Sequence, residues 1–161
     1  MMKKALLVVC VLLFGFSVSY AEDENASPED VYNLVLKAYD VVKALGEESF
    51  PAFNDPKGEF VYKDTYVLVQ RCPSEMVAHP FALEKLRSVD LDKTYEWNKK
   101  LCDAGAQPGG GWTEYPWPKP GETEPSRKIT FSILVEGTPY TVMAGVYSDT
   151  AKVEELNATL K

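Results

Sequence analysis

Histidine is nearly absent from this sequence, and its scarcity excludes several kinds of functional site. His79 is the only histidine among 161 residues, so a zinc site built from a histidine cluster cannot form. Cys72 and Cys102 do not have the spacing of a metal-binding motif. There is also no Gly-x-Ser-x-Gly nucleophile elbow, phosphate-binding loop or dinucleotide fingerprint. We therefore expect no catalytic residues, metal or cofactor, and the protein is not predicted to be an enzyme.

Long hydrophobic runs are equally scarce, and the one that occurs lies at the N-terminus. Ala5 to Phe16 is apolar but too short to span a bilayer comfortably. Two lysines precede this run, and Ser19-Tyr20-Ala21 places small residues at the cleavage-determining positions. These features predict a signal peptide over residues 1–21, with a retained N-terminal anchor as the alternative. Residues 22–161 would then form one periplasmic or secreted domain that does not span the membrane.

Positive charge is in short supply as well. The chain has 17 lysines and arginines against 24 acidic residues, and loss of the signal peptide changes the formal net charge from -7 to -9. Because an acidic surface repels phosphate backbones, nucleic acid is not expected as a partner. The remaining 140 residues are enough for a single core.

Two cysteines remain after cleavage. In an oxidising compartment the even pair, Cys72 and Cys102, suggests a disulfide, and two buried free thiols are the alternative. A bridge between them would close a loop of about 30 residues, which stabilises the fold by roughly 3–4 kcal/mol in chain-entropy terms.

The pattern of apolar residues predicts a mixed fold. Ser27 and Pro28 open a long helix that ends at Gly46, and a short second helix, interrupted near Pro51, follows it. Residues 81–104 are predicted to be mostly helical, and a closing helix is expected to be capped by Ser148 or Asp149. Strands are predicted at 66–70, 75–79, 111–117, 128–135 and 139–147. Short connections favour an antiparallel sheet, so we expect an α+β fold with a long N-terminal helix packed on about five strands.

Alternation along the strands predicts two different sheet faces. In residues 128–135 the apolar side chains Ile129, Phe131, Ile133 and Val135 point one way, and Lys128, Thr130 and Ser132 point the other way. One suitable register would gather a polar and aromatic set on the second face. This set is Tyr66, His79, Tyr115, Trp117 and Lys128.

Such a face suits a small anion. Lys128 supplies positive charge, His79 and the tyrosine hydroxyls supply directed donors, and the aromatic rings exclude water. Trp112, Trp117 and tyrosines could instead cage a quaternary amine by cation–π attraction, although Lys128 would repel a cation. Each of these residues also has a purely structural interpretation, as strand-end, core or solvent-facing positions.

Several ordered motifs resemble the single Cache domain family, in its second type, the PAS-related extracytoplasmic sensor modules. The motifs are Phe53-Asn54-Asp55-Pro56-Lys57-Gly58-Glu59-Phe60, Tyr66-Val67, Ala78-His79-Pro80, Gly110-Gly111-Trp112-Thr113-Glu114-Tyr115-Pro116-Trp117, the strand of Lys128, and Ala144-Gly145-Val146-Tyr147. The resemblance implies a ligand pocket on the sheet face opposite the long helix, often for small organic acids. It implies that Tyr66, His79, Tyr115, Trp117 and Lys128 contact the ligand.

The sequence departs from the family pattern at the turn Arg71-Cys72-Pro73-Ser74-Glu75 and between Pro80 and Gly109. No kinase or chemotaxis module accompanies the domain, so a stand-alone binding protein for a small carboxylate is expected, which could present the ligand to a receptor or transporter. A ligand-independent module that docks on such a membrane protein is the alternative. A hydrolase or lyase using Glu114 or His79 is a third hypothesis.

Overall fold

A computed structural model describes residues 24–160 of the chain, so the predicted signal peptide over residues 1–21 lies outside the described residues. The long helix α1 spans Pro28–Leu45, as predicted. The Ser27 hydroxyl accepts from the Asp30 amide at 3.1 Å, and the Asp30 carboxylate accepts from the Ser27 amide at 2.9 Å. This reciprocal cap satisfies amides that the first turn leaves unpaired. Gly46, with φ of 57°, ends the helix.

The main sheet has five antiparallel strands in the order β4-β3-β7-β6-β5. The strands are β3 Leu68–Arg71, β4 Glu75–Ala78, β5 Gly111–Pro118, β6 Pro125–Leu134 and β7 Tyr140–Tyr147. A separate two-stranded ribbon is formed by β1 Val61–Tyr62 and β2 Thr65–Tyr66. The predicted α+β fold with a central antiparallel sheet is confirmed.

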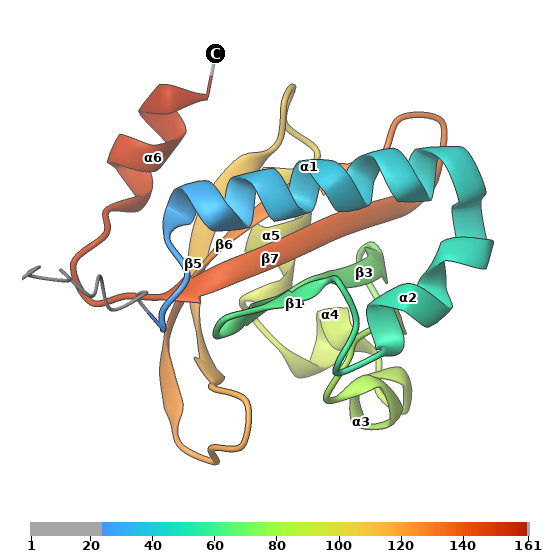
Figure 1. Cartoon of the computed structure of the whole chain (residues 1–161), viewed down its shortest axis with the longest axis horizontal. Coiled ribbons are helices and arrows are strands. Elements are labelled where there is room, and N and C mark those ends of the chain that lie inside the picture. The colour runs from blue at the N-terminus through green and yellow to red at the C-terminus, as the bar shows by residue number, and fades with distance from the viewer. Residues whose placement is uncertain (1–23, 161) are drawn as a thin grey trace, which may run out of the picture.

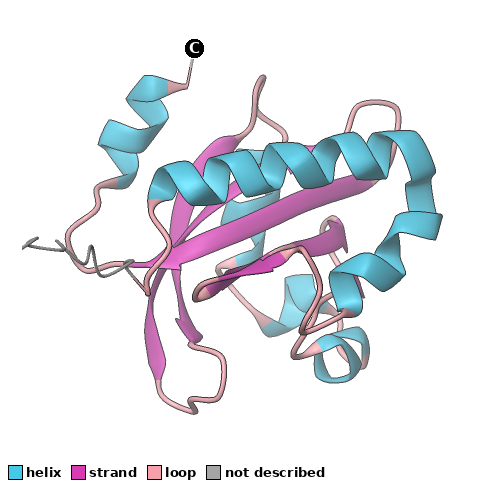
Figure 2. Ribbon diagram, in the orientation of Figure 1, coloured by secondary structure: helices cyan, strands magenta, loops and turns pink. Residues whose placement is uncertain are grey.

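Helices cover both faces of the sheet (Figure 1). Helix α1 crosses one face and contacts β6 and β7. The opposite face is covered by three short helices, α3 Leu83–Arg87, α4 Leu91–Thr94 and α5 Asn98–Gly105, of which α5 contacts β5, β6 and β7. Figure 2 shows the sheet between these two helical layers. Each face therefore has its own hydrophobic cluster.

Two predicted elements differ from the structure. Residues 66–70 are not one strand, because Tyr66 ends β2 and β3 begins at Leu68. Residues 81–104 are three short helices joined by turns rather than one mostly continuous helix. Each is too short to be stable alone, so its position depends on contacts with the sheet.

The ends of two helices also differ from expectation. Gly46–Ser49 forms a 3-10 turn, and α2 spans Phe50–Asn54 with Pro51 in its first turn, where a missing amide costs nothing. Pro51 therefore starts a helix instead of interrupting one. Helix α6, Val153–Thr159, has Lys152 at its N-cap position, so the predicted cap by Ser148 or Asp149 is wrong. Ser148 instead accepts hydrogen bonds from the amides of Thr150 and Ala151, at 3.3 and 3.0 Å.

The disulfide prediction is confirmed. Cys72 and Cys102 are bridged, with their Cα atoms 5.8 Å apart. The bridge fastens α5 to the β3–β4 turn, so one end of the helical cover is held covalently to the sheet. Tyr115 and Trp117 on β5 lie beneath this cover.

Candidate functional site

A row of buried polar side chains marks the sheet face beneath the helical cover. Lys128, Thr130 and Ser132 follow one another at every second position of β6, and their side chains point away from α1. The apolar side chains between them pack in the cluster beneath α1, as the alternation predicted. Lys128 Nζ, Thr130 Oγ1 and Ser132 Oγ have no hydrogen-bond partner within residues 24–160. Buried polar atoms are normally paired, so this row is the most unusual feature of the core.

Lys128 is fully buried among tyrosines. Its exposed fraction is 0%, and its ammonium lies 3.9 Å from the ring centroid of Tyr66 and 5.1 Å from that of Tyr147. Tyr115 stands opposite Lys128 on β5, in the register that the sequence required for this face. Burial lowers the pKa of Lys128 to about 7, against a weaker opposing field from Asp64.

Gly145 on β7 provides the space for this row. A Cβ at residue 145 would lie 2.3 Å from Thr130 Oγ1, 2.7 Å from the Ile129 carbonyl oxygen and 3.0 Å from Lys128 Cε. Any side chain here would therefore collide with the backbone of β6 as well as with the two polar side chains. Within the Ala144-Gly145 motif, Gly145 therefore leaves space for the polar row, whereas Ala144 packs in the cluster beneath α1.

His79 is held in a defined neutral form. Its Nδ1 accepts hydrogen bonds from the amides of Phe81 and Ala82, at 3.1 and 3.0 Å, which leaves the proton of the neutral ring on Nε2. Burial and then the charge of Lys128 lower the pKa of His79 to about 3. The His79 amide donates to Asn54 Oδ1 at 2.9 Å, so the last residue of α2 helps to fix the position of the histidine.

The aromatic side chains form a continuous wall around the histidine. The His79 ring centroid lies 4.9 Å from that of Tyr66 and 6.4 Å from that of Trp117. Trp97 stacks on Tyr115 with ring centroids 4.3 Å apart. Burial raises the pKa of Tyr66 and of Tyr115 far above the ordinary value, so both hydroxyls stay protonated at any physiological pH.

All five predicted ligand residues lie on the same side of the sheet, but they border different spaces. His79, Tyr115 and Trp117 line an inner cavity of about 10 Å³, which holds about one water molecule. Tyr66 lines a separate outer cavity of about 340 Å³, together with Lys63, Asp64, Phe81, Lys119 and Glu122 among others. Lys128 borders neither cavity, because the Tyr66 ring lies against its ammonium.

Sequence reasoning missed several residues of the inner cavity, including Gln70, Trp97 and Asn98. Gln70 Nε2 donates to Asn98 Oδ1 at 2.8 Å and to the Pro73 carbonyl at 3.1 Å. A signal for this pair was present. Gln70 lies two residues before Cys72, and Asn98 lies one helical turn before Cys102, so the disulfide brings them together.

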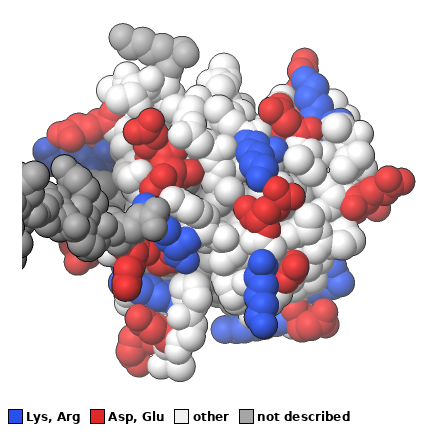
Figure 3. All heavy atoms as spheres, in the orientation of Figure 1, with Lys and Arg blue, Asp and Glu red and all other residues white. Residues whose placement is uncertain are grey.

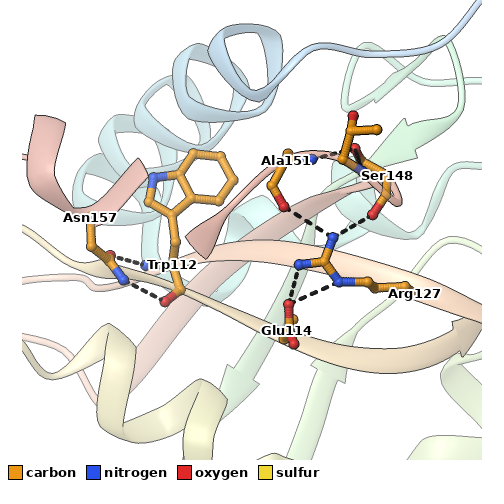
Figure 4. A network of polar contacts seen from close by, with 7 residues as sticks. Trp112, Glu114, Arg127, Ser148, Ala151 and Asn157 are labelled. Carbon is orange, nitrogen blue, oxygen red and sulfur yellow. Dashed lines mark hydrogen bonds and ion pairs between the residues drawn. The ribbon is translucent and has the colours of Figure 1, made fainter. Parts of the chain in front are cut away.

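Glu114 lies on a different surface from the pocket. Arg127 binds it through Nε at 2.9 Å and also through Nη2 (Figure 4). Arg127 Nη1 donates to the carbonyls of Ser148 and Ala151 at 2.7 and 3.0 Å. Glu114 is therefore linked, through Arg127, to the segment before α6. It is not paired with His79 in an acid/base arrangement.

Trp112 also belongs to the opposite face. Its ring packs on Phe131 at a centroid distance of 5.2 Å, in the cluster beneath α1. Its backbone amide and carbonyl are bridged by the Asn157 side chain of α6, at 2.8 and 3.0 Å (Figure 4). The amine cage that combined Trp112 with Trp117 is therefore wrong.

A roomier cavity of about 410 Å³ lies elsewhere, between α1, β5 and α6, and is lined by Tyr32, Trp112, Leu156 and Leu160 among others. It touches none of the five predicted residues. Within residues 24–160 no helix combines the length and the apolar character needed to cross a membrane, and no group of three metal-ligating side chains is placed to hold an ion.

The neutral histidine gives a testable pH dependence. Because the pKa of His79 is lowered from its ordinary 6.5 to about 3, only the unfolded state takes up a proton between these values. The histidine therefore contributes stability above pH 6.5 that is lost as the pH falls toward 3. Relative to His79→Asn, the wild type should lose about 2 kcal/mol of unfolding free energy between pH 7 and pH 5.

Asparagine is the matched variant because its Oδ1 can accept from the same two amides. His79→Ala leaves those amides without an acceptor and should cost about 1–3 kcal/mol at pH 7. Urea unfolding at several pH values measures both effects. Parallel curves for the wild type and His79→Asn from pH 7 to 5 would mean that the histidine titrates freely in the folded protein.

Comparison with known proteins agrees with this architecture. The family model described as Single Cache domain 2 matches residues 23–159. One similar solved structure, a Cache chemosensory domain described in connection with carboxylic acid recognition, is 23% identical with a TM-score of 0.53, covering 73% of this chain and 86% of that chain. Another is a methyl-accepting chemotaxis protein from Vibrio parahaemolyticus, 16% identical with a TM-score of 0.50, covering 73% of this chain and 80% of that chain. These structures support the fold.

Proposed function

Because the chain belongs to the Single Cache domain 2 family, we propose that it binds a small carboxylate outside the cytoplasm, in a pocket between the sheet and its helical cover. Single Cache domains are extracytoplasmic ligand-sensing modules, so membership of the family supports a non-enzymatic sensing role. The carboxylate is our own proposal. The observation that carries it is the Lys128 ammonium, buried without a hydrogen-bond partner among residues 24–160.

Charge and hydrogen-bonding capacity favour an anion. Lys128 supplies a cation, and His79 Nε2 is a donor because Nδ1 is occupied by two amides. Thr130 and Ser132 add unpaired hydroxyls along β6, about 7 Å apart at successive inward positions. A carboxylate at Lys128 would convert an unpaired charge into a charge-assisted hydrogen bond, which is stronger in a water-excluded site. Recognition of carboxylic acid by a Cache chemosensory domain of similar fold adds support.

The small inner cavity requires movement before a ligand can enter. A volume of about 10 Å³ does not hold even acetate. We place the entrance at the outer cavity, where the Tyr66 ring stands between that space and Lys128. Rotation of this ring would join the outer cavity to the polar row. The lining of this opening balances Lys63 and Lys119 against Asp64 and Glu122, so the attraction for an anion would come from Lys128 behind the Tyr66 ring.

The test is a thermal-shift screen of acetate, propionate, lactate, malonate and succinate with the purified domain at pH 6.5. We predict a concentration-dependent rise in Tm for at least one acid, because a ligand that binds only the folded state stabilises it. Propionamide and lactamide, the matching uncharged amides, are the control and should have no effect. If none of the acids raises Tm above its amide control, the carboxylate proposal is wrong.

One observation favours a second candidate, a ligand-independent module that docks on a membrane receptor or transporter. The inner cavity is nearly filled by the protein's own side chains. However, lysines, arginines and acidic residues are interspersed over the face that carries α1 (Figure 3), where Lys37 pairs with Glu59 and Lys43 with Glu136. That face has no single-sign patch among the described residues to direct docking. Salt-sensitive capture of a receptor, unchanged by Lys128→Ala and His79→Ala, would support this candidate.

A further inference from the structure

We infer that an anion entering this pocket above neutral pH brings a proton with it, so that Lys128 is then mostly an uncharged amine in the closed domain and an ammonium in the complex. The inference rests on the proposed function and concerns how the same site is regulated. It makes the affinity of the domain depend on external pH near neutrality. The reaction is balanced simply, because the Nζ lone pair takes one proton from solvent and forms one N–H bond.

The geometry around Nζ is the basis of this inference. The group is fully buried, and no acceptor among residues 24–160 forms a hydrogen bond with it. A charged ammonium without acceptors keeps its desolvation cost, whereas a neutral amine avoids most of it. The Tyr66 ring, whose centroid lies 3.9 Å from Nζ, offsets part of that desolvation cost by cation–π attraction to the ammonium. An aromatic ring, however, offers no lone pair that could accept a hydrogen bond from Nζ.

The side chains that surround Lys128 supply little compensating charge. Tyr66 from β2, Tyr115 from β5 and Tyr147 from β7 enclose it, and burial raises the pKa of each, so all three are neutral near pH 7. His79, after β4, is neutral in the same range and repels the ammonium only when it is itself protonated.

Asp64, in the turn between β1 and β2, is the one acid among the described residues whose field favours the charged form of Lys128. Its carboxylate Oδ1 accepts from the Ala26 amide at 2.7 Å instead of from Nζ. Burial prevails over this field, and the pKa of Lys128 falls to about 7. A ligand carboxylate beside Nζ supplies the missing negative charge and acceptors, so it returns the lysine to the charged form.

Two consequences can be measured. Above neutral pH, binding must consume close to one proton per ligand. Affinity must fall about tenfold between pH 6 and pH 8, because a shrinking fraction of the free protein carries the ammonium. The ligand does not contribute, since acetate, propionate and succinate are ionised over most of this range.

The experiment is isothermal titration calorimetry with acetate, propionate and succinate at pH 8, in HEPES and in Tris, whose ionisation enthalpies differ. The apparent binding enthalpy should differ between the buffers by the amount expected for uptake of about one proton. Lys43→Met is the matched variant and should keep that uptake, because Lys43 is exposed, pairs with Glu136 and lies outside the pocket. Equal enthalpies in both buffers, with binding intact and independent of pH, would overturn the proton coupling and leave the carboxylate function standing.

An NMR titration of the ligand-free protein separates the proton coupling from the proposed carboxylate binding. In protein labelled with ¹³C and ¹⁵N on lysine, the Lys128 Cε and Nζ resonances should titrate near neutrality and should stay in the ammonium form to higher pH when the acid is added. Lys128→Met identifies the resonances by their loss. A Lys128 that stays charged from pH 6 to pH 9 without ligand would contradict the inference. No heat or resonance change with any of the three acids would overturn the function and the coupling together.

Discussion

Replacing Lys128 by methionine should make the domain more stable and should strongly weaken its binding of carboxylates. Methionine fills nearly the same volume and removes a buried polar group that has no partner among residues 24–160. We expect the free energy of unfolding at pH 7 to rise by roughly 2–4 kcal/mol. Binding should weaken by about 30- to 100-fold, because a charge-assisted hydrogen bond in a dry site is lost.

The stability gain should also depend on pH in a defined direction. The folded protein releases the Lys128 proton near pH 7, whereas the unfolded chain keeps it up to the ordinary value of 10.5. Because the unfolded state then binds more protons than the folded state, the wild type should gain stability from pH 7 to pH 9 relative to Lys128→Met. Urea unfolding at these pH values and titration with the acid measure both effects.

Lys43→Met is the matched control. Lys43 lies on the solvent side of α1 and pairs with Glu136. An exposed pair of this kind contributes at most about 1 kcal/mol, so the control should change little and should leave binding intact. A Lys128→Met protein that is destabilised, or that still binds the acid as tightly as the wild type, would contradict the assignment.

Replacing Gly145 by alanine should destabilise the domain strongly. The new Cβ would lie 2.7 Å from the Ile129 carbonyl oxygen and 2.3 Å from Thr130 Oγ1. The carbonyl belongs to a central strand and cannot move without disrupting the β6–β7 ladder. Overpacking in a rigid core typically costs 1–3 kcal/mol, and we expect about 3 kcal/mol here, measured by urea unfolding. Any folded fraction should also bind the acid more weakly, since Lys128 is displaced.

Gly121→Ala is the control for this substitution. Gly121 lies in the loop between β5 and β6, has φ of 82°, and has no atom within 4 Å of an added Cβ. The cost there is the backbone conformation alone, about 1 kcal/mol. Equal losses at residues 121 and 145 would mean that the space above Lys128 is not restricted as described.

Local rules are enough to predict much of this molecule. Ser27 and Asp30 form a cap because their spacing satisfies the first amides of α1, and this is visible in the sequence. The alternation of Ile129 and Phe131 with Lys128 is sufficient to place the lysine on the sheet face opposite α1. The pairing of Cys72 with Cys102 likewise follows from compartment and number.

Other features depend on contacts between distant segments and could not be predicted locally. The burial of Lys128 results from the Tyr66 ring, which the β1–β2 ribbon places over it. The sequence gives only a weak indication of where the three helices of the cover begin and end. These short helices are held in place by contacts with distant segments, such as the hydrogen bond from the Leu91 amide to the Ser74 carbonyl. The 10 Å³ cavity follows from side-chain packing in three dimensions, which no periodicity encodes.

The most direct measurement is a crystal structure of the domain with the carboxylate that gives the largest rise in Tm. We predict that the Tyr66 ring has moved, and that the ligand's carboxylate lies within hydrogen-bond distance of Lys128 Nζ, beneath the cover formed by α3, α4 and α5. A ligand bound in the cavity between α1 and α6, with Tyr66 still packed against Lys128, would contradict the proposed site.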